Sequence, residues 1–212
     1  FSFNCFDPHH AFDPPKEYLD RYDPADMPLP KYREGELDNK TSYQRLDHEW
    51  AHNEPGYFHV AGMTDDDKRQ VYAANLAMCE LIDDQVGRIL AALEETGQRE
   101  NTIVIFMSDH GEMLGDHGLY LKGPHFYEEA VHVPLTMSWP GRFEAGLAVD
   151  GLVELVDIAP TLLEAAGIEV PERMQGRSLA PLCRGEADPT RFRDFVYSEY
   201  YNSWAHEHAY GT

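Results

Sequence analysis

Cysteine, basic residues and long apolar runs are all scarce in this chain of 212 residues. The three cysteines, Cys5, Cys79 and Cys183, are widely spaced, and no two of them form a Cys-x-x-Cys pair. This pattern excludes a disulfide framework and a cysteine-based zinc cluster. No stretch approaches the roughly 18 apolar residues of a transmembrane helix. No signal peptide is recognisable either.

Basic residues are outnumbered, with 17 lysines and arginines against 38 acidic residues and a formal net charge of −21. Proteins that bind nucleic acid or anionic membranes need basic patches, so the composition argues against both. A small anionic substrate is still compatible with this charge, because salt screens distant surface charges over about 8–10 Å. At contact distance, a nearby cation would then outweigh the repulsion between the substrate and the distant acidic residues.

The length allows one substantial core, or one domain and part of a second. The chain begins with Phe1-Ser2-Phe3 rather than with methionine. We therefore expect a piece of a longer protein, in which missing targeting signals carry no information about the cellular compartment.

The most informative segment is the apolar run from Ile103 to Met107, which stops abruptly at Ser108-Asp109-His110-Gly111. Such a run predicts a strand buried on both faces, as in the middle of a parallel sheet. Ligands bind open α/β sheets at the carboxyl ends of the strands. Asp109 and His110 carry oxygen and nitrogen donors that suit a divalent cation. The simplest alternative is a strand-end turn with a solvated carboxylate.

The loop that follows contains Gly111, Gly115 and Gly118, which allow sharp turns and close approach to a ligand. Lys122 lies twelve residues after His110 and offers the compact positive charge that an oxyanion site needs. Glu112 and Asp116 are expected to be solvated or orienting residues, and His117 to stabilise the loop. Together, the glycines and the lysine favour a site for a metal and an anion over the plain turn.

The rest of the chain predicts alternating helices and strands. A helix capped by Thr64 and ended by Gly97 is the clearest of them, and its likeliest role is purely structural. Residues 7–15 contain three prolines and predict a loop. Residues 18–62 predict a long ordered excursion with a turn or two of helix. The remaining expected elements are strands at 1–6, 133–139 and 195–201, a strand or turn leading into a helix over 152–166, and a helical turn at 178–183.

At this point the sequence resembles the sulfatases of the alkaline phosphatase superfamily. SDHGEMLGDHGLYLKGPHFYEEAVHVPL (108–135) is similar to the second signature region of that family. The similarity continues through LVDIAPTLLEAAGI (155–168) and MQGRSLAPLCRGE (174–186), and it reaches back to DPHHAFDPP (7–15). It therefore covers nearly the whole chain. The resemblance implies an α/β, alkaline-phosphatase-like fold with a mixed sheet flanked by helices. Residues 1–189 would be the C-terminal part of the catalytic domain, and 190–212 the incomplete beginning of a small C-terminal subdomain.

The resemblance also implies roles for individual residues. Asp109 and His110 match metal ligands, and Lys122 matches the lysine that binds the sulfate oxygens. His9 matches the histidine that contacts the ester oxygen, and a histidine can protonate a leaving group near neutral pH. Ala11 stands where the family usually has proline, so the choice between His9 and His10 stays open. A histidine pair that caps a strand end is the bland alternative.

His125 lies three residues after Lys122 and is a further candidate for substrate binding. The family's nucleophile is a formylglycine made from the first residue of Cys/Ser-x-Pro-x-Arg, and none of the three cysteines begins that motif. Two aspartates that complete the family's metal site have no match either. We therefore expect the formylglycine and the missing ligands upstream of this chain, and calcium, with manganese as the alternative, as the metal.

The implied activity of the whole protein is hydrolysis of a sulfate monoester. Its partners would be a sulfated small molecule or saccharide and the N-terminal half of the same protein, while a homo-oligomer is left open. The 212 residues alone are expected to be inactive. Phosphonate monoester or phosphodiester hydrolases of the superfamily are the first alternative, and phosphoethanolamine transferases are more distant. A non-catalytic module that binds anionic sugars is an alternative from a different class.

Overall fold

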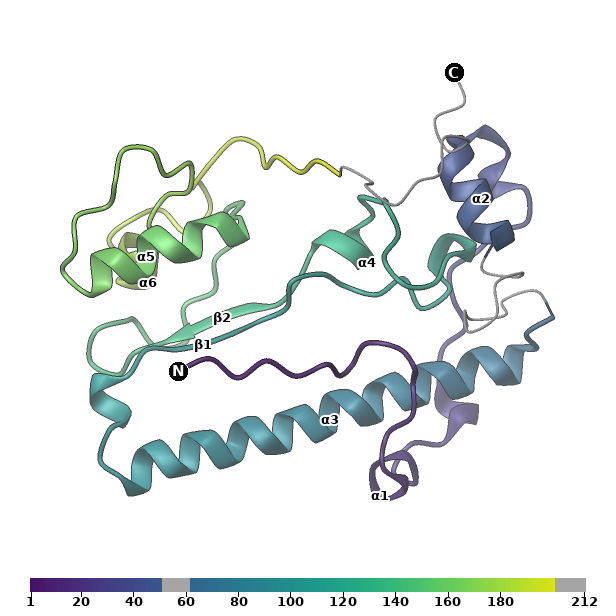
Figure 1. The fold of residues 1–212 in the computed structure, drawn as a ribbon, viewed down its shortest axis with the longest axis horizontal. Helices are drawn as coiled ribbons and strands as arrows, with labels where there is room; N and C mark the ends of the chain where they lie inside the picture. Colours follow the sequence, from purple (N-terminus) through teal and green to yellow (C-terminus); the bar gives the residue numbers. More distant parts are fainter. Residues whose placement is uncertain (51–61, 201–212) are drawn as a thin grey trace. The chain divides into compact units, whose positions relative to one another are not determined.

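The computed structural model describes residues 1–50 and 62–200, with the side chain of Trp50 excepted. Figure 1 labels the helices and strands of these residues. The helices are α1 (Lys16–Leu19), α2 (Ser42–Trp50), α3 (Asp65–Glu95), α4 (Glu128–Val131), α5 (Ile158–Ala165) and α6 (Ala180–Cys183). The strands are β1 (Val104–Met107) and β2 (Leu135–Ser138). Short 3₁₀ turns occur at Pro24–Asp26, Glu36–Asn39, Arg99–Asn101, Asp116–Gly118 and Leu155–Asp157.

The chain divides into two compact units, each of which is described by itself. The first unit includes Phe1–Ala91 and His110–Val133, and the second includes Ala92–Asp109 and Pro134–Glu199. Within the described residues, no helix is both long enough and apolar enough to cross a bilayer.

Helix α3 begins and ends where the sequence predicts. The hydroxyl of Thr64 accepts the N–H of Asp67 at 3.2 Å, and the carboxylate of Asp67 accepts the N–H of Thr64 at 2.7 Å. This reciprocal pair satisfies donors that the first helical turn would otherwise leave open. At the other end Gly97 has a φ of +65°, a conformation that suits glycine after a helix. The predicted helix is confirmed.

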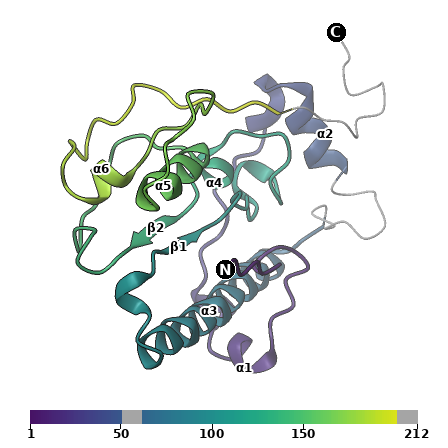
Figure 2. The same ribbon diagram turned by 60° about the vertical axis from the view of Figure 1, so that its left-hand side comes forward.

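In the first unit, α3 supports the N-terminal loop. Its most buried stretch runs from Ala73 to Met78. Asn75 lies in this stretch, and its amide donates to the carbonyl of Pro8 at 3.5 Å. Figures 1 and 2 both show the N-terminal segment, in purple, running beside α3. The predicted loop over 7–15 is therefore confirmed and anchored next to His9.

In the second unit, β1 pairs with β2 in antiparallel orientation, with Val104 opposite Ser138 and Met107 opposite Leu135. The strand over 103–107 is confirmed, but its predicted parallel, doubly buried setting is wrong. Phe106 and Met107 are 40% and 45% exposed. A strand is buried on both faces when it lies inside a sheet that helices cover above and below. Among the described residues β1 has one neighbouring strand, β2, and does not lie inside such a sheet.

Two other predicted strands are wrong. Residues 1–6 form no strand, and Phe1, Phe3 and Phe6 are exposed. Residues 195–200 form no strand, although the N–H of Tyr197 donates to Glu154. Both segments have strand-like composition, yet neither has a neighbouring strand to complete a ladder among the described residues.

The remaining elements follow the expected pattern more closely. Helix α5 has Pro160 in its first turns and is followed by Gly167, and α6 provides the expected turn near 180. Within 18–50, the predicted excursion contains helix α2 and short turns. The part of the excursion at 51–61, and the end of the predicted strand at residue 201, lie outside the described residues.

Candidate active site

His9 and Lys122 meet in the first unit, although the sequence separates them by 113 positions. The Nζ atom of Lys122 lies 2.5 Å from Nε2 of His9. The other ring nitrogen, Nδ1, lies 2.8 Å from the carbonyl oxygen of His10. A carbonyl oxygen only accepts, so Nδ1 carries the hydrogen and Nε2 accepts from the lysine ammonium. The two residues that the resemblance selected for chemistry are therefore in direct contact.

The loop that carries Lys122 is fixed to the first unit by backbone contacts. The N–H of Gly111 donates to the carbonyl of Ala130 at 2.8 Å. A Cβ atom at position 111 would collide with the carbonyl of Glu129, so only glycine fits here. Further along, Met113 and Leu119 are buried with Ala130 in the local core. These contacts explain why a glycine-rich loop can hold a lysine in a defined place.

His10 stacks on His9 with the ring centroids 4.1 Å apart. Its Nδ1 atom is buried and has no hydrogen-bond partner within the described residues. Burial lowers the pKa of His10, and the nearby His9 and Lys122 lower it further. The ring of His10 is therefore neutral near pH 7, and its contact with the ammonium-bearing pair adds no second positive charge.

Asp109 and His110 are successive residues. Asp109, the last residue of its segment in the second unit, is exposed, and His110 is half-buried in the first unit. The Nδ1 atom of His110 lies 2.9 Å from the carbonyl oxygen of Gly111, which places the imidazole lone pair on Nε2. In histidines that bind a metal, the ring nitrogen that does not bind it typically makes a contact of this kind. The donor set therefore fits two ligands of a divalent cation. Within the described residues, no cluster of three or more His, Cys, Asp or Glu completes a coordination shell.

His125 is buried, with its side chain 2% exposed, and its Nε2 atom contacts Oδ2 of Asp47 at 2.8 Å. Its role in substrate binding stays a prediction. Asp47 belongs to a segment, residues 30–48, that we call the strap. His48 of the strap contacts the carbonyl of Gly118 at 2.6 Å, and the N–H of Lys31 donates to Asp116 at 2.7 Å. The strap therefore packs against the loop that carries Lys122.

His117 contributes to the same packing, as expected for a loop stabiliser. Its Nδ1 atom contacts Glu36 of the strap, and its ring stacks on Tyr127 at 4.1 Å. The hydrogen bond from His117 is the main reason that the pKa of Glu36 lies below its ordinary value. Histidines near the loop thus serve two purposes: His9 meets Lys122, whereas His117 and His125 bind the strap.

Glu112 is expected from the sequence to be a solvated or an orienting residue, and the structure contradicts the first alternative. Its side chain is half-buried, and its carboxylate accepts the N–H of Leu121 at 2.5 Å. Burial raises the pKa of Glu112, while its backbone donors and the charges of Lys122 and His9 act in the opposite direction. The available signal was its place between the metal-ligand pair and the lysine, on a loop with little room for solvent.

One serine of the chain begins a segment that matches the formylglycine motif. Ser138-Trp139-Pro140-Gly141-Arg142 fits Ser-x-Pro-x-Arg letter by letter. Ser138, however, ends β2 opposite Val104, five positions before Asp109 along the neighbouring strand. At about 3.3 Å per residue this is on the order of 15 Å from the proposed ligand. The Ser138 hydroxyl is also engaged by Arg99 at 2.5 Å. The residues therefore do not fit a formylglycine site, and we assign no step to one.

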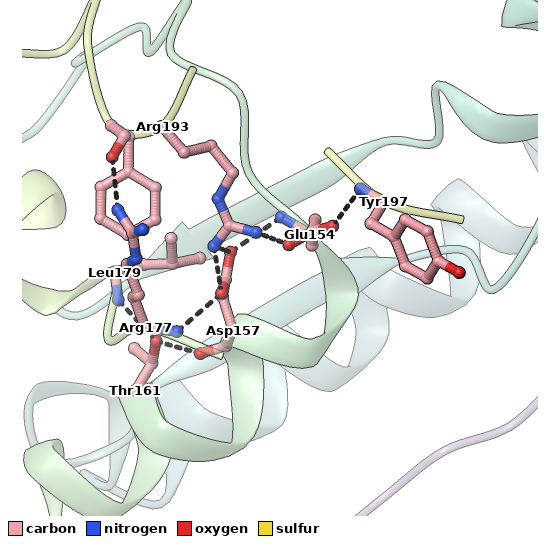
Figure 3. A network of polar contacts seen from close by, with 8 residues as sticks. Glu154, Asp157, Thr161, Arg177, Leu179, Arg193 and Tyr197 are labelled. Carbon is pink, nitrogen blue, oxygen red and sulfur yellow. Dashed lines mark hydrogen bonds and ion pairs between the residues drawn. The ribbon is translucent and has the colours of Figure 1, made fainter. Parts of the chain in front are cut away.

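The second unit contains a buried polar network that the sequence reasoning missed entirely (Figure 3). Its centre is Asp157, which is fully buried and receives two bonds from Arg193, at 2.5 and 2.6 Å. The N–H groups of Glu154 and Arg177 also donate to this carboxylate, each at 2.8 Å. Arg193 pairs with Glu154 as well. The network joins the start of α5 to the segments around 177 and 193.

Solved structures resemble the chain over most of its length. A phosphonate monoester hydrolase from Silicibacter pomeroyi superposes with a TM-score of 0.74 and 34% identity, over 85% of this chain and 36% of the other. A second protein, solved in complex with its substrate D-glucosamine-2-N,6-O-disulfate, superposes with a TM-score of 0.73 and 25% identity, over 94% of this chain and 50% of the other. The fold class is therefore α/β and alkaline-phosphatase-like, as predicted.

The sequence comparisons narrow this class. The sulfatase family model matches residues 1–168, so the chain belongs to the sulfatase family. An arylsulfatase from Clostridium perfringens is 35% identical over 196 residues, which cover 91% of this chain and 38% of the relative. The chain thus spans less than half the length of that curated relative. The family generally uses a divalent metal and a formylglycine.

Proposed function

We propose that the protein of which these residues form part hydrolyses the sulfate monoester of a small molecule or saccharide. The observation that carries this proposal is the contact between His9 and Lys122 at 2.5 Å, with the ring of His9 5.9 Å from that of His110. Membership of the sulfatase family supports it. The arylsulfatase relative and the structure with a disulfated glucosamine support the choice of a sulfate ester.

Lys122 is proposed to bind the sulfate oxygens. Its Nζ atom contacts an imidazole acceptor, and no carboxylate forms an ion pair with it among the described residues. The carboxylate of Glu112 also acts on it from further away, but a cation in this setting keeps an attraction for an incoming anion. Stabilising charge on the transferred group with preorganised donors is a large term in this kind of catalysis.

His9 is proposed to assist the departing alcohol. Its Nε2 atom faces the ammonium of Lys122, so the pair shares a proton between two nitrogen atoms. A proton held there can pass to the leaving-group oxygen when the ester bond breaks. His10, stacked behind His9, would bound the substrate pocket without adding charge. His125 would support the pocket from its position against Asp47.

Asp109 and His110 are proposed to hold a divalent cation, calcium by resemblance to the family. When bound, such a cation would polarise the sulfate oxygens. Manganese is the alternative, and the imidazole of His110 favours it, because calcium prefers oxygen ligands. Titrating the metal-free protein with each ion, with binding measured by calorimetry, decides between the two metals.

A phosphonate monoester hydrolase is the second candidate, and the superposition on such an enzyme with a TM-score of 0.74 favours it. The decisive experiment measures initial rates of the intact protein on 4-nitrophenyl sulfate and on 4-nitrophenyl phenylphosphonate. We expect the sulfate ester to give the higher kcat/KM. A preference for the phosphonate would replace the proposal by the second candidate. Binding of sulfated sugars without turnover of either ester would instead identify a binding module.

A further inference from the structure

Glu112 has contacts that no assignment above uses. It follows Gly111 directly, and its Oε1 atom accepts two backbone N–H groups of the same loop. The donor of the first is Leu121, at 2.5 Å, and the donor of the second is Leu114, at 3.3 Å. One carboxylate oxygen therefore joins the two ends of the loop 114–121 from the inside.

The two donors have an unusual backbone conformation. Leu114 has a φ of +46° and Leu121 a φ of +65°, values that residues with a Cβ atom rarely adopt. Such conformations persist where the surroundings hold them in place, and they gather at functional sites. The N–H of Met113 adds one bond to the carbonyl of Leu121 at 2.8 Å. The carboxylate of Glu112 accepts the N–H groups of both leucines.

Lys122 is the next residue after Leu121 in the chain. The direction of its side chain is set by the backbone of Leu121, which the carboxylate of Glu112 holds. The ammonium of Lys122 also lowers the pKa of Glu112 against the effect of burial. Glu112 therefore acts on the lysine twice, through the peptide bond and through space. Met113 and Leu119 of the same loop are buried.

We propose that Glu112 is a positioning residue that holds Lys122 against His9. The proposal rests on the proposed function, because it assigns Glu112 to the same reaction. It predicts that loss of the carboxylate displaces Lys122 from His9, and that an amide oxygen at the same place keeps Lys122 in position. A glutamate that only stabilised the loop would not change the position of Lys122.

The test compares Glu112→Ala and Glu112→Gln in the intact protein, with Glu34→Ala, a change at an exposed strap residue, as the control. A displacement of about 1 Å in a catalytic group can cost on the order of 10²-fold in rate. We therefore expect Glu112→Ala to lower kcat by 10-fold to 10²-fold with a smaller change in KM. The amide oxygen of Glu112→Gln can still accept both N–H groups, so this variant should keep most of the turnover. Retained turnover in Glu112→Gln beside lost turnover in Glu112→Ala would show that the hydrogen-bond acceptor, and not the bulk of the side chain, holds Lys122 in place.

A second measurement does not depend on the substrate. Lys122 is labelled with an N-hydroxysuccinimide ester, and the rate of labelling is followed by mass spectrometry of the peptide that contains it. We expect faster labelling in Glu112→Ala than in the wild type or the Glu34→Ala control. If the intact protein hydrolyses no sulfate ester but the labelling rate rises, the proposed function fails and the positioning role stands. Wild-type labelling together with wild-type kcat in Glu112→Ala would overturn the inference. If Glu112→Ala does not fold, Glu112→Asp takes its place, because its shorter side chain withdraws the carboxylate from both N–H groups, and faster labelling is again expected.

Discussion

Two polar clusters, one in each unit, differ in how their charges are balanced. In the second unit, the guanidinium of Arg193 faces two carboxylates, those of Glu154 and Asp157, and Asp157 also receives two backbone N–H groups. In the first unit, Lys122 faces the neutral ring of His9. Burial differs as well, because Asp157 is fully buried whereas Glu112 of the first unit is half-buried.

The difference shows what each cluster can do. A buried charge that is fully paired and hydrogen-bonded holds segments together, and removal of one partner leaves the other uncompensated. A cation paired with a neutral group keeps its attraction for an anion that arrives from solvent. We therefore assign the Asp157 cluster to stability and the Lys122 cluster to chemistry. The following variants separate these two properties, from the largest expected effect to the smallest.

Asp109→Ala should abolish turnover, because it removes a charged ligand from a hard cation. Thermal unfolding of the metal-free variant and of the metal-free wild type is compared, so that loss of the metal ligand is separated from loss of the fold. Activity, calorimetric metal binding and unfolding are measured on the same preparations. Parental activity together with parental metal content would show that the metal-site assignment is wrong.

Asp157→Ala should produce the reverse pattern. Breaking a buried pair costs about 3–5 kcal/mol, so the free energy of unfolding should fall by this order in urea titrations. Turnover per folded molecule should stay close to that of the wild type. Asp150→Ala, at an exposed position of the same unit, is the matched control and should be nearly silent. If Asp157→Ala is as stable as the wild type but has lost turnover, the cluster takes part in the reaction and its assignment to stability is wrong.

Glu36→Gln should give the smallest effect, because the Glu36–His117 pair is partly exposed. We expect a loss of about 1 kcal/mol or less at pH 7. The pKa of Glu36 lies below its ordinary value, so its contribution is present above the ordinary pKa of glutamate and is lost as pH falls through the lower, folded value. The difference between the two proteins in urea should therefore shrink in acid. A difference that stays constant as pH falls below the ordinary pKa of glutamate would show that the pairing does not stabilise the strap.

Local patterns in the sequence were enough to predict several features of both units. Thr64 and Gly97 define helix α3 through their own caps, and the chain turns where prolines and glycines are dense. The pair of His9 and Lys122 could be predicted because a family pattern joins residues that lie far apart in sequence. Their direct contact confirms that the chain brings them together, while their roles stay predictions.

Other features depend on partners that no local pattern names. The composition of 1–6 and 195–201 favours strands, but a strand forms only beside a neighbour. Asp157 looks like an ordinary residue at the start of a helix, because its partner Arg193 comes 36 positions later. Glu112 looks solvated until the leucine N–H groups that it binds are located in space. Long-range compensation of charge is therefore the part of the structure that sequence reasoning could not supply.

The most direct test of the account is a double-mutant cycle on His9 and Lys122 in the intact protein, with kcat/KM measured on 4-nitrophenyl sulfate. Lys122→Ala should lower turnover by about 10²-fold or more, on the order of the loss of one oxyanion-stabilising group. Its metal content should not change, since an ammonium group cannot bind a cation. His9→Ala should also lower turnover. The kcat/KM of the double variant should be little lower than that of the less active single variant, because the effects of groups that act as a unit are not additive. Losses that multiply, or wild-type rates in either single variant, would contradict the assignment of His9 and Lys122 to one catalytic pair.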